Sequence, residues 1–169
     1  MRGIVVSVVA AALAGCSGEG SGVTVYLEQR LGPDGPPGQV APVLEPTERP
    51  PRKDMGAAAQ ALVQLRQGAT PDERARGMSA PVEPATRLRL DRIENGVAFV
   101  EVAGKPLDSM GVAAVVFSLT ELPEIDHVHV CCGHRHDGSR IFVHTRASYR
   151  GWQGEPCAER RENRCLRDR

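Results

Sequence analysis

The feature that most constrains the fold is a β-hairpin signal in the middle of the chain. Thr86 to Glu94 reads as a strand with Leu88 and Leu90 on one face, and Gly96 to Val102 reads as a second strand. Asn95-Gly96 separates them. A two-residue Asn-Gly loop favours a type I′ turn, whose twist matches that of the strands it joins. The chain is therefore expected to contain an antiparallel strand pair at this place.

Other elements are expected on both sides of the hairpin. The sequence Thr70-Pro-Asp-Glu73 is a capping box with proline at the first helical position, and Asp54 is the expected N-cap of the preceding helix. Apolar periodicity predicts strands at 23–29, 41–45, 127–132 and 140–145, and helices at 54–68, 70–77 and 107–122. This order predicts an α+β fold, with a mixed β-sheet and two main helices packed on one face.

The N-terminus has the pattern of a lipoprotein signal peptide. Residues 4–14 are apolar but too few to span a bilayer as a helix. Leu13-Ala-Gly-Cys16 resembles a bacterial lipobox, and a Ser/Gly-rich tether follows to residue 22. We expect residues 1–15 to be removed and Cys16 to carry lipid, palmitate included, which would anchor the protein to the outer face of the cytoplasmic membrane. The alternative is an ordinary signal peptide with a chance cysteine.

The remaining cysteines predict two disulfides. An exported protein lies in a compartment that permits disulfides. Assigning Cys16 to lipid leaves an even number, namely Cys131, Cys132, Cys157 and Cys165. Each cysteine of the adjacent pair is expected to bond one tail cysteine, and both pairings stay open. Each bond would close a loop of about 25–35 residues, which corresponds to about 3–4 kcal/mol in the chain-entropy model. Residues 147–169 are thus expected to form an irregular tail stapled to a domain at 23–146.

A metal site is the alternative use of the same segment. Side chains alternate along a strand, so His127, His129 and Cys131 share one face and Val128, Val130 and Cys132 the other. Two imidazoles and a thiolate could bind Zn²⁺ tetrahedrally with one more histidine from the following loop, His134 or His136. No established ligand spacing matches, so this predicts a metal-binding (Zn or Cu) envelope protein only as an alternative.

Charge and motifs argue against other classes. Lys+Arg and Asp+Glu both number 21, whereas a nucleic-acid binder normally shows a basic excess. The sequence contains no Gly-x-Ser-x-Gly elbow and no phosphate-binding glycine loop. Its glutamates are scattered and suggest no convergent acid pair, which a glycan hydrolase would need. We therefore expect no catalytic residues and no cofactor, with a role as a peptidoglycan hydrolase accessory as a weaker alternative.

Seven short segments follow one another in a recognisable order and spacing. They are Val-Thr-Val-Tyr-Leu at 23–27, Ala-Leu-Val-Gln-Leu at 61–65, Gly-Ala-Thr-Pro-Asp-Glu-Arg-Ala at 68–75, Pro-Ala-Thr-Arg-Leu at 84–88, Glu-Asn-Gly-Val-Ala-Phe-Val-Glu-Val at 94–102, Phe-Ser-Leu-Thr-Glu-Leu-Pro at 117–123 and His-Val-His-Val-Cys-Cys at 127–132. Together they resemble the GerMN domain family, a sporulation and germination lipoprotein module. The chain departs from the family in a short segment after Val102, in Cys132-Gly-His134 at the place of an acidic turn, and in its cysteine-bearing tail.

The resemblance implies a compact module outside the membrane, similar to ring-building folds, that acts in envelope assembly or beside sensor kinases. It implies no catalytic residues. We therefore expect a non-enzymatic protein-interaction module with an envelope protein as partner, and self-association is possible. Unpaired strand edges recruit partner strands, so Val23–Gln29 and Ala41–Glu45 are the expected contact surfaces.

Overall fold

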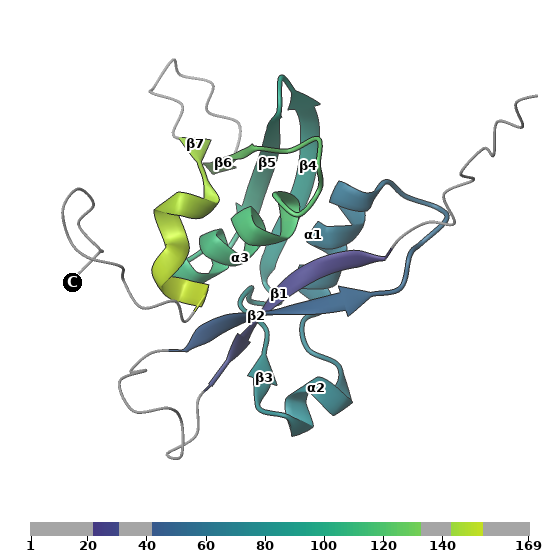
Figure 1. Cartoon of the computed structure of the whole chain (residues 1–169), viewed down its shortest axis with the longest axis vertical. Coiled ribbons are helices and arrows are strands. Elements are labelled where there is room, and N and C mark those ends of the chain that lie inside the picture. The colour runs from purple at the N-terminus through teal and green to yellow at the C-terminus, as the bar shows by residue number, and fades with distance from the viewer. Residues whose placement is uncertain (1–21, 31–41, 133–142, 154–169) are drawn as a thin grey trace, which may run out of the picture.

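The structure, a computed structural model, describes residues 22–30, 42–132 and 143–153. Its elements follow the expected order of strands and helices (Figure 1). In chain order they are β1 (Val23–Gln29), β2 (Val43–Arg49), α1 (Ala57–Gln67), α2 (Pro71–Ala75), β3 (Met78–Ser79), β4 (Thr86–Glu94), β5 (Val97–Gly104), α3 (Ser109–Leu119), β6 (His127–Cys132), β7 (Val143–His144) and the 3-10 helix η1 (Arg146–Gln153).

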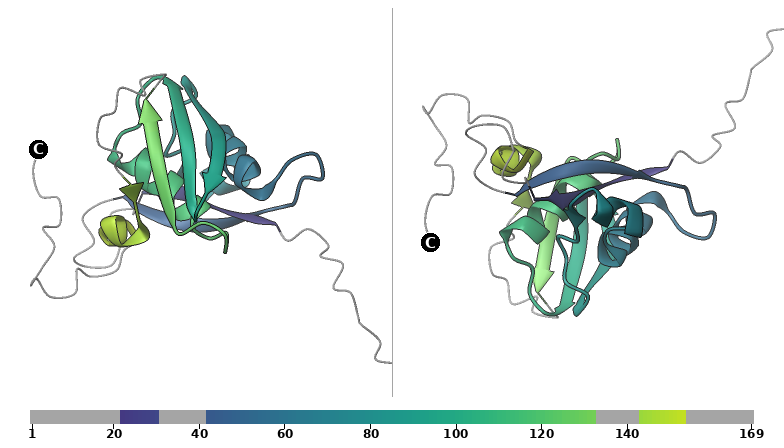
Figure 2. Two further views of the ribbon diagram at one scale, coloured as in Figure 1. Left: turned by 90° about the horizontal axis from the view of Figure 1, so that it is seen from above. Right: turned by 90° about the horizontal axis from the view of Figure 1, so that it is seen from below.

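The strands form two sheets, so the expectation of one mixed sheet was wrong. One sheet is antiparallel with the order β2-β1-β3, and the other has the order β4-β5-β6-β7 with a parallel β5–β6 pair. The two sheets run in different directions (Figure 2), and α1 and α3 each contact strands of both. Nine of the eleven α3 residues are buried. A helix buried on almost every side needs cover on more than one face, which a single sheet cannot provide.

The predicted hairpin is confirmed. Asn95 and Gly96 both have positive φ, 50° and 76°, as a type I′ turn requires. They connect β4 and β5, which pair along their length with one irregularity between Leu90 and Arg92. Inward-facing Val100 and Val102 join the core, while Phe99 and Glu101 face outward. The hairpin therefore supplies one buried face and one open face.

The helix starts agree with the sequence in one case and differ in another. The predicted capping box of α2 is present, with Thr70 and Glu73 bonded to each other's backbone N–H groups. The expected N-cap Asp54 is wrong, because α1 begins after Gly56. Asp54 lies two residues before the N-cap Gly56, and its carboxylate instead pairs with Arg52.

Two other segments differ from the prediction. Strand β2 starts later than expected and runs on through Pro46 to Arg49, because the chain can keep its extended course where proline's missing N–H faces away from the neighbouring strand. Residues 147–153, expected to be irregular, belong to η1. Arg146, Tyr149 and Trp152 follow one another at intervals of three residues, but the backbone kinks at Tyr149, so η1 consists of two short 3-10 turns and not of one regular helix. A search for α-helical or strand periods does not detect such short turns.

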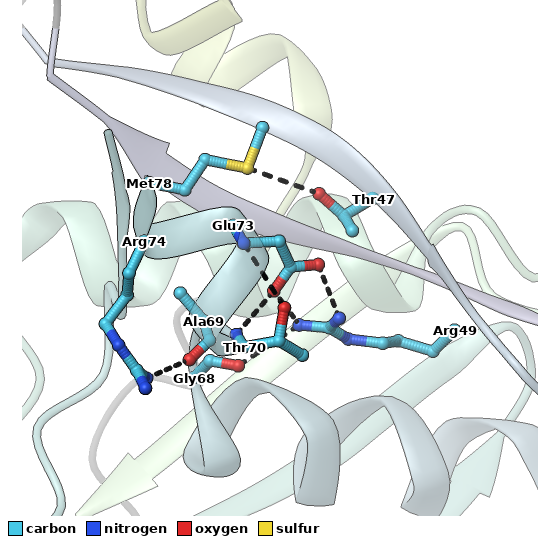
Figure 3. A network of polar contacts seen from close by, with 8 residues as sticks. All are labelled: Thr47, Arg49, Gly68, Ala69, Thr70, Glu73, Arg74 and Met78. Atoms are coloured by element: carbon cyan, nitrogen blue, oxygen red, sulfur yellow. Dashed lines mark hydrogen bonds and ion pairs between the residues drawn. The ribbon is translucent and has the colours of Figure 1, made fainter. Parts of the chain in front are cut away.

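A buried ion pair joins the end of β2 to α2 (Figure 3). The Arg49 guanidinium donates to both carboxylate oxygens of Glu73, at 2.5 and 2.8 Å, and to the Gly68 carbonyl at 3.1 Å. Both side chains are less than a tenth exposed. The Thr70 N–H also donates to Glu73. This network fixes the α1–α2 connection against the antiparallel sheet and takes no part in the surfaces described next.

Candidate functional site

The outer face of the four-stranded sheet carries the histidine strand. As predicted, Val128 points into the core and is fully buried, while His127 and His129 lie on the opposite face. There His129 is the register partner of Phe99, and the two rings meet edge to face with centroids 5.5 Å apart. On the far side of Phe99, the Arg92 guanidinium lies 3.8 Å from the ring centre.

These contacts form a row across all four strands. Arg92, Phe99, His129 and Val143 are successive register partners on β4, β5, β6 and β7. Val143 is 42% exposed. We call these four residues the outer row. Ion pairs border the row on β4 and β5, where Arg89 pairs with Glu101 at 2.6 Å and Arg92 with Glu94 at 3.2 Å. Aromatic and arginine side chains with a charged border are the composition of a protein-interface centre and its rim.

The structure leaves the metal and disulfide predictions open. Cys131 is half-buried beside Glu101 on the outer face. Within the described residues, no group of three or more His, Cys, Asp or Glu side chains is placed to hold a metal ion. His134, His136, Cys157, Cys165 and Cys16 lie outside the described residues, so the metal site, the stapled tail and the lipid anchor stay predictions.

A thiol count separates the two predictions for the cysteines. For the exported chain purified without chelator, two disulfides predict no free thiols and a mass lower by four hydrogens. A zinc site predicts free thiols and one equivalent of metal, which His129→Ala would lower. Finding free thiols without metal would contradict both.

His144 on β7 is the one histidine that the predicted metal site did not include. The Tyr149 hydroxyl and His144 Nδ1 are hydrogen-bonded at 2.8 Å. Burial, together with the neighbouring imidazole of His129, lowers the pKa of His144. Burial also raises the pKa of Tyr149. No helical or strand period relates His144 to Tyr149, which lies five residues later, so this pair carried no signal in the sequence.

The lowered pKa of His144 predicts a pH dependence of stability. An unfolded chain binds the proton more readily than the folded one, so the free energy of unfolding should fall as the pH drops below about 6.5. Urea unfolding of the wild type and His144→Gln between pH 7.5 and 5.5 checks this. The variant should show a flatter dependence in that range, and parallel curves would contradict the assignment. His127→Gln is the matched control, because it replaces an exposed histidine and should leave the pH dependence of the wild type unchanged.

A second polar cluster joins β1, α3 and η1. The Tyr26 hydroxyl donates to Glu121 Oε1 at 2.6 Å, and Arg146 Nη2 donates to the Tyr26 oxygen at 2.6 Å and to Glu121 at 2.7 Å. The guanidinium carbon also lies 5.5 and 5.4 Å from the ring centres of Tyr26 and Phe117. Burial and then the Glu121 hydrogen bond raise the pKa of Tyr26. Burial acts to raise the pKa of Glu121, but the bonds from Tyr26 and Arg146 prevail and lower it, so Glu121 stays charged and Tyr26 neutral.

The strand edges expected to recruit partners are protected. Strand β1 is central in its sheet, and the Tyr26 N–H donates to Ser118 Oγ on α3 at 3.0 Å. The N–H and C=O of one strand residue point to the same side, so Tyr26 points away from its register partner Pro46. The nitrogen of Pro46 therefore lies on the outer edge of β2, where an added strand would need a donor. Proline at this position removes one donor from the edge and disfavours strand addition there.

The Ser118 hydroxyl is expected to stabilise the fold through this edge. Ser118→Ala leaves the Tyr26 N–H buried without its acceptor, which should lower the free energy of unfolding by about 1–3 kcal/mol. Thr120→Ala is the matched control. The hydroxyls of Ser118 and Thr120 both donate to a carbonyl one turn back in α3, but Thr120 is the C-cap residue and accepts no bond from β1 in the described contacts. Urea unfolding should separate the two, and equal losses would show that the strand edge does not depend on Ser118.

Comparison with known proteins identifies the family. A family model named Germane, described as sporulation and spore germination, matches residues 12–131. The chain belongs to the Germane family. The match confirms the GerMN resemblance and includes every strand and helix from β1 to α3 and nearly all of β6. Strand β7 and η1 of this Germane protein follow the residues that the family model matches.

Solved structures agree with this Germane fold. The tandem GerMN domains of the sporulation protein GerM from Bacillus subtilis match with a TM-score of 0.59 and 16% identity, over 74% of this chain and 45% of that one. The chain thus spans less than half of the tandem structure. The first GerMN domain of the same protein matches with a TM-score of 0.46 and 18% identity, over 67% of this chain and 83% of that one. No curated protein matches the chain. The likeness to the tandem domains shows a GerMN-like α+β fold.

Proposed function

We propose that this Germane domain is a lipid-anchored envelope protein that works through protein contacts rather than catalysis. Germane domains are not known as enzymes, and the family description places the module in sporulation and spore germination. The lipobox pattern at Cys16 supports an anchor on the outer face of the cytoplasmic membrane. None of the helices in the described residues is both long and apolar enough to cross a membrane.

The outer row is the observation that carries the proposal. Pro46 and Ser118 each protect one position on the edges of β2 and β1. The outer row presents an aromatic ring, an imidazole and an exposed valine on one face of the other sheet. The surrounding ion pairs are solvent-exposed and contribute little to stability, so they remain available to set the orientation of a partner. We therefore assign the envelope partner to the outer row instead of the sheet edges.

Photo-crosslinking tests the assignment. A photoreactive phenylalanine analogue replaces Val143 on the outer row, and the same analogue replaces exposed Gln67 on α1 as a control. A discrete adduct in envelope fractions is expected from Val143 alone, and Phe99→Ala in the Val143 chain should reduce it severalfold. Equal adducts from both positions, or none, would refute the outer row as the contact surface.

The anchor is tested separately. Cys16→Ser should move the protein from the membrane fraction to the soluble fraction, with the outer row unaffected. If Cys16→Ser leaves the protein in the membrane fraction, lipid on Cys16 is not the anchor, whatever the crosslinking result.

A further inference from the structure

The side chains that surround Arg146 form a complete recognition set for a guanidinium. We call Tyr26, Phe117 and Glu121 the Tyr26 cluster. Glu121 supplies a carboxylate, Tyr26 supplies a hydroxyl acceptor, and both rings lie within 5.5 Å of the guanidinium carbon. A planar guanidinium can bond these acceptors and stack on rings at once, which a lysine ammonium cannot do equally well. The Tyr26 cluster is therefore expected to favour arginine over lysine.

The segment that supplies this arginine contacts α3 and β2. Among the described residues, β7 pairs with β6 through Val143 and His144. Arg146 and Glu121 keep 35% and 34% of their side-chain surface exposed, so another guanidinium could reach the carboxylate. Of the η1 residues whose burial is described, Tyr149 is buried, Arg146 and Trp152 are half-buried and the others are exposed. Segments with few buried apolar contacts open at a lower free-energy cost than the core.

The same segment lies outside the part of the chain that the family model matches. Residues 12–131 contain Tyr26, Phe117 and Glu121, but Arg146 and η1 follow them. The matched domain thus contributes the whole Tyr26 cluster, and the arginine comes from an appended segment. Figure 1 shows this segment lying alongside α3.

We propose that the Tyr26 cluster is a second contact site, for an arginine on a partner protein, and that η1 occupies it as a built-in competitor. This rests on the proposed function as a protein-contact module but uses side chains other than those of the outer row. The resident segment indicates the chemistry of the partner, a peptide with an arginine followed three residues later by an aromatic residue. Because η1 occupies the site for part of the time, the apparent affinity of the domain for the partner equals its intrinsic affinity multiplied by the fraction of time that the site is free.

A peptide-binding experiment tests the proposal on the full chain. The probe is a fluorescent synthetic peptide with the sequence of residues 143–153, and the control peptide carries Arg146→Lys. The chain variant Arg146→Ala/Tyr149→Ala releases η1, and circular dichroism with a thermal melt confirms its fold. Fluorescence anisotropy should show at least tenfold tighter binding of the probe to this variant than to the wild type. Adding Glu121→Gln to the variant, or using the control peptide, should remove most of that gain.

Two results would overturn the proposal. One is a folded double variant that binds the probe no better than the wild type does. The other is a gain that Glu121→Gln and the lysine peptide leave unchanged, which would indicate nonspecific adhesion to exposed core. If the double variant does not fold, Arg146→Ala alone, which leaves Tyr149 in place, is measured with the same peptides against the same criteria. Dimers formed through η1 of a second copy would appear as self-association of the wild type and would identify that copy as the partner.

The two proposals fail independently. Loss of the Val143 adduct with intact peptide binding would remove the outer row and keep the Tyr26 cluster. The opposite result would keep the outer row as the contact surface and reduce η1 to a structural element.

Discussion

Replacing Arg49 by alanine is expected to lower the free energy of unfolding by about 3–5 kcal/mol, because it leaves the Glu73 carboxylate buried without its main partner. The Gly68 carbonyl loses a donor at the same time. Urea unfolding at pH 7 measures the change. Arg92→Ala removes an arginine from exposed ion pairs and should cost less than about 1 kcal/mol. A loss below 1 kcal/mol for Arg49→Ala would mean that water or a rearranged α2 compensates Glu73.

The same ion pair has a pH signature. Burial acts to raise the pKa of Glu73, but the hydrogen bonds from Arg49 and Thr70 prevail and lower it. A carboxyl with a lowered folded pKa stabilises the protein above its unfolded pKa and loses that contribution as the pH falls through the folded value. The loss should therefore begin near pH 4.5, well below the range in which His144 acts, so the two effects are separable in one titration.

The second large effect is expected at Phe117, which is fully buried in α3. Its ring packs against Tyr26 with centroids 5.2 Å apart. Phe117→Ala should lower the free energy of unfolding by about 3–5 kcal/mol, because it leaves a cavity between the helices and the sheets. Phe117→Leu keeps most of the volume and should cost about 1 kcal/mol. Similar losses for both variants would show that ring contacts, and not volume, dominate at this site.

Phe117 also connects the core to η1, because Arg146 lies over its ring. Limited proteolysis after Arg146 and Arg150 should therefore be faster in Phe117→Leu than in wild type, even though the domain remains folded. Unchanged cleavage would separate the core role of Phe117 from its contact with Arg146.

Local sequence signals predicted the elements well. The Asn95-Gly96 turn and the Thr70–Glu73 capping box are both present, since each depends on residues adjacent in sequence. The faces of β6 were also predicted, because alternation divides His127 and His129 from Val128 wherever the strand lies.

Features that depend on distant partners were missed. Alternation shows that a strand has a buried face but not which strands pair, so the division into two sheets could not be predicted. The Tyr26 cluster and Arg146 come from β1, η1 and the C-terminal end of α3, which are far apart in sequence. No local pattern around Tyr26 predicts its bonds to Glu121 and Arg146. The protection of the β1 edge by Ser118 was missed for the same reason, since a serine inside an apolar helix gives no sign of its acceptor role.

The bond between Tyr26 and Ser118 has a consequence for the order of folding. It joins residues 92 positions apart, and the Arg146 bond to Tyr26 joins residues 120 apart. Contacts with such long sequence separation form late and slow the folding reaction. A chain that emerges gradually from a ribosome can pair β1 with β2 and form the β4–β5 hairpin early, but the Tyr26 N–H has no acceptor until α3 has emerged. The first strand to emerge is thus paired on one side early and on the other side only after most of the chain has followed.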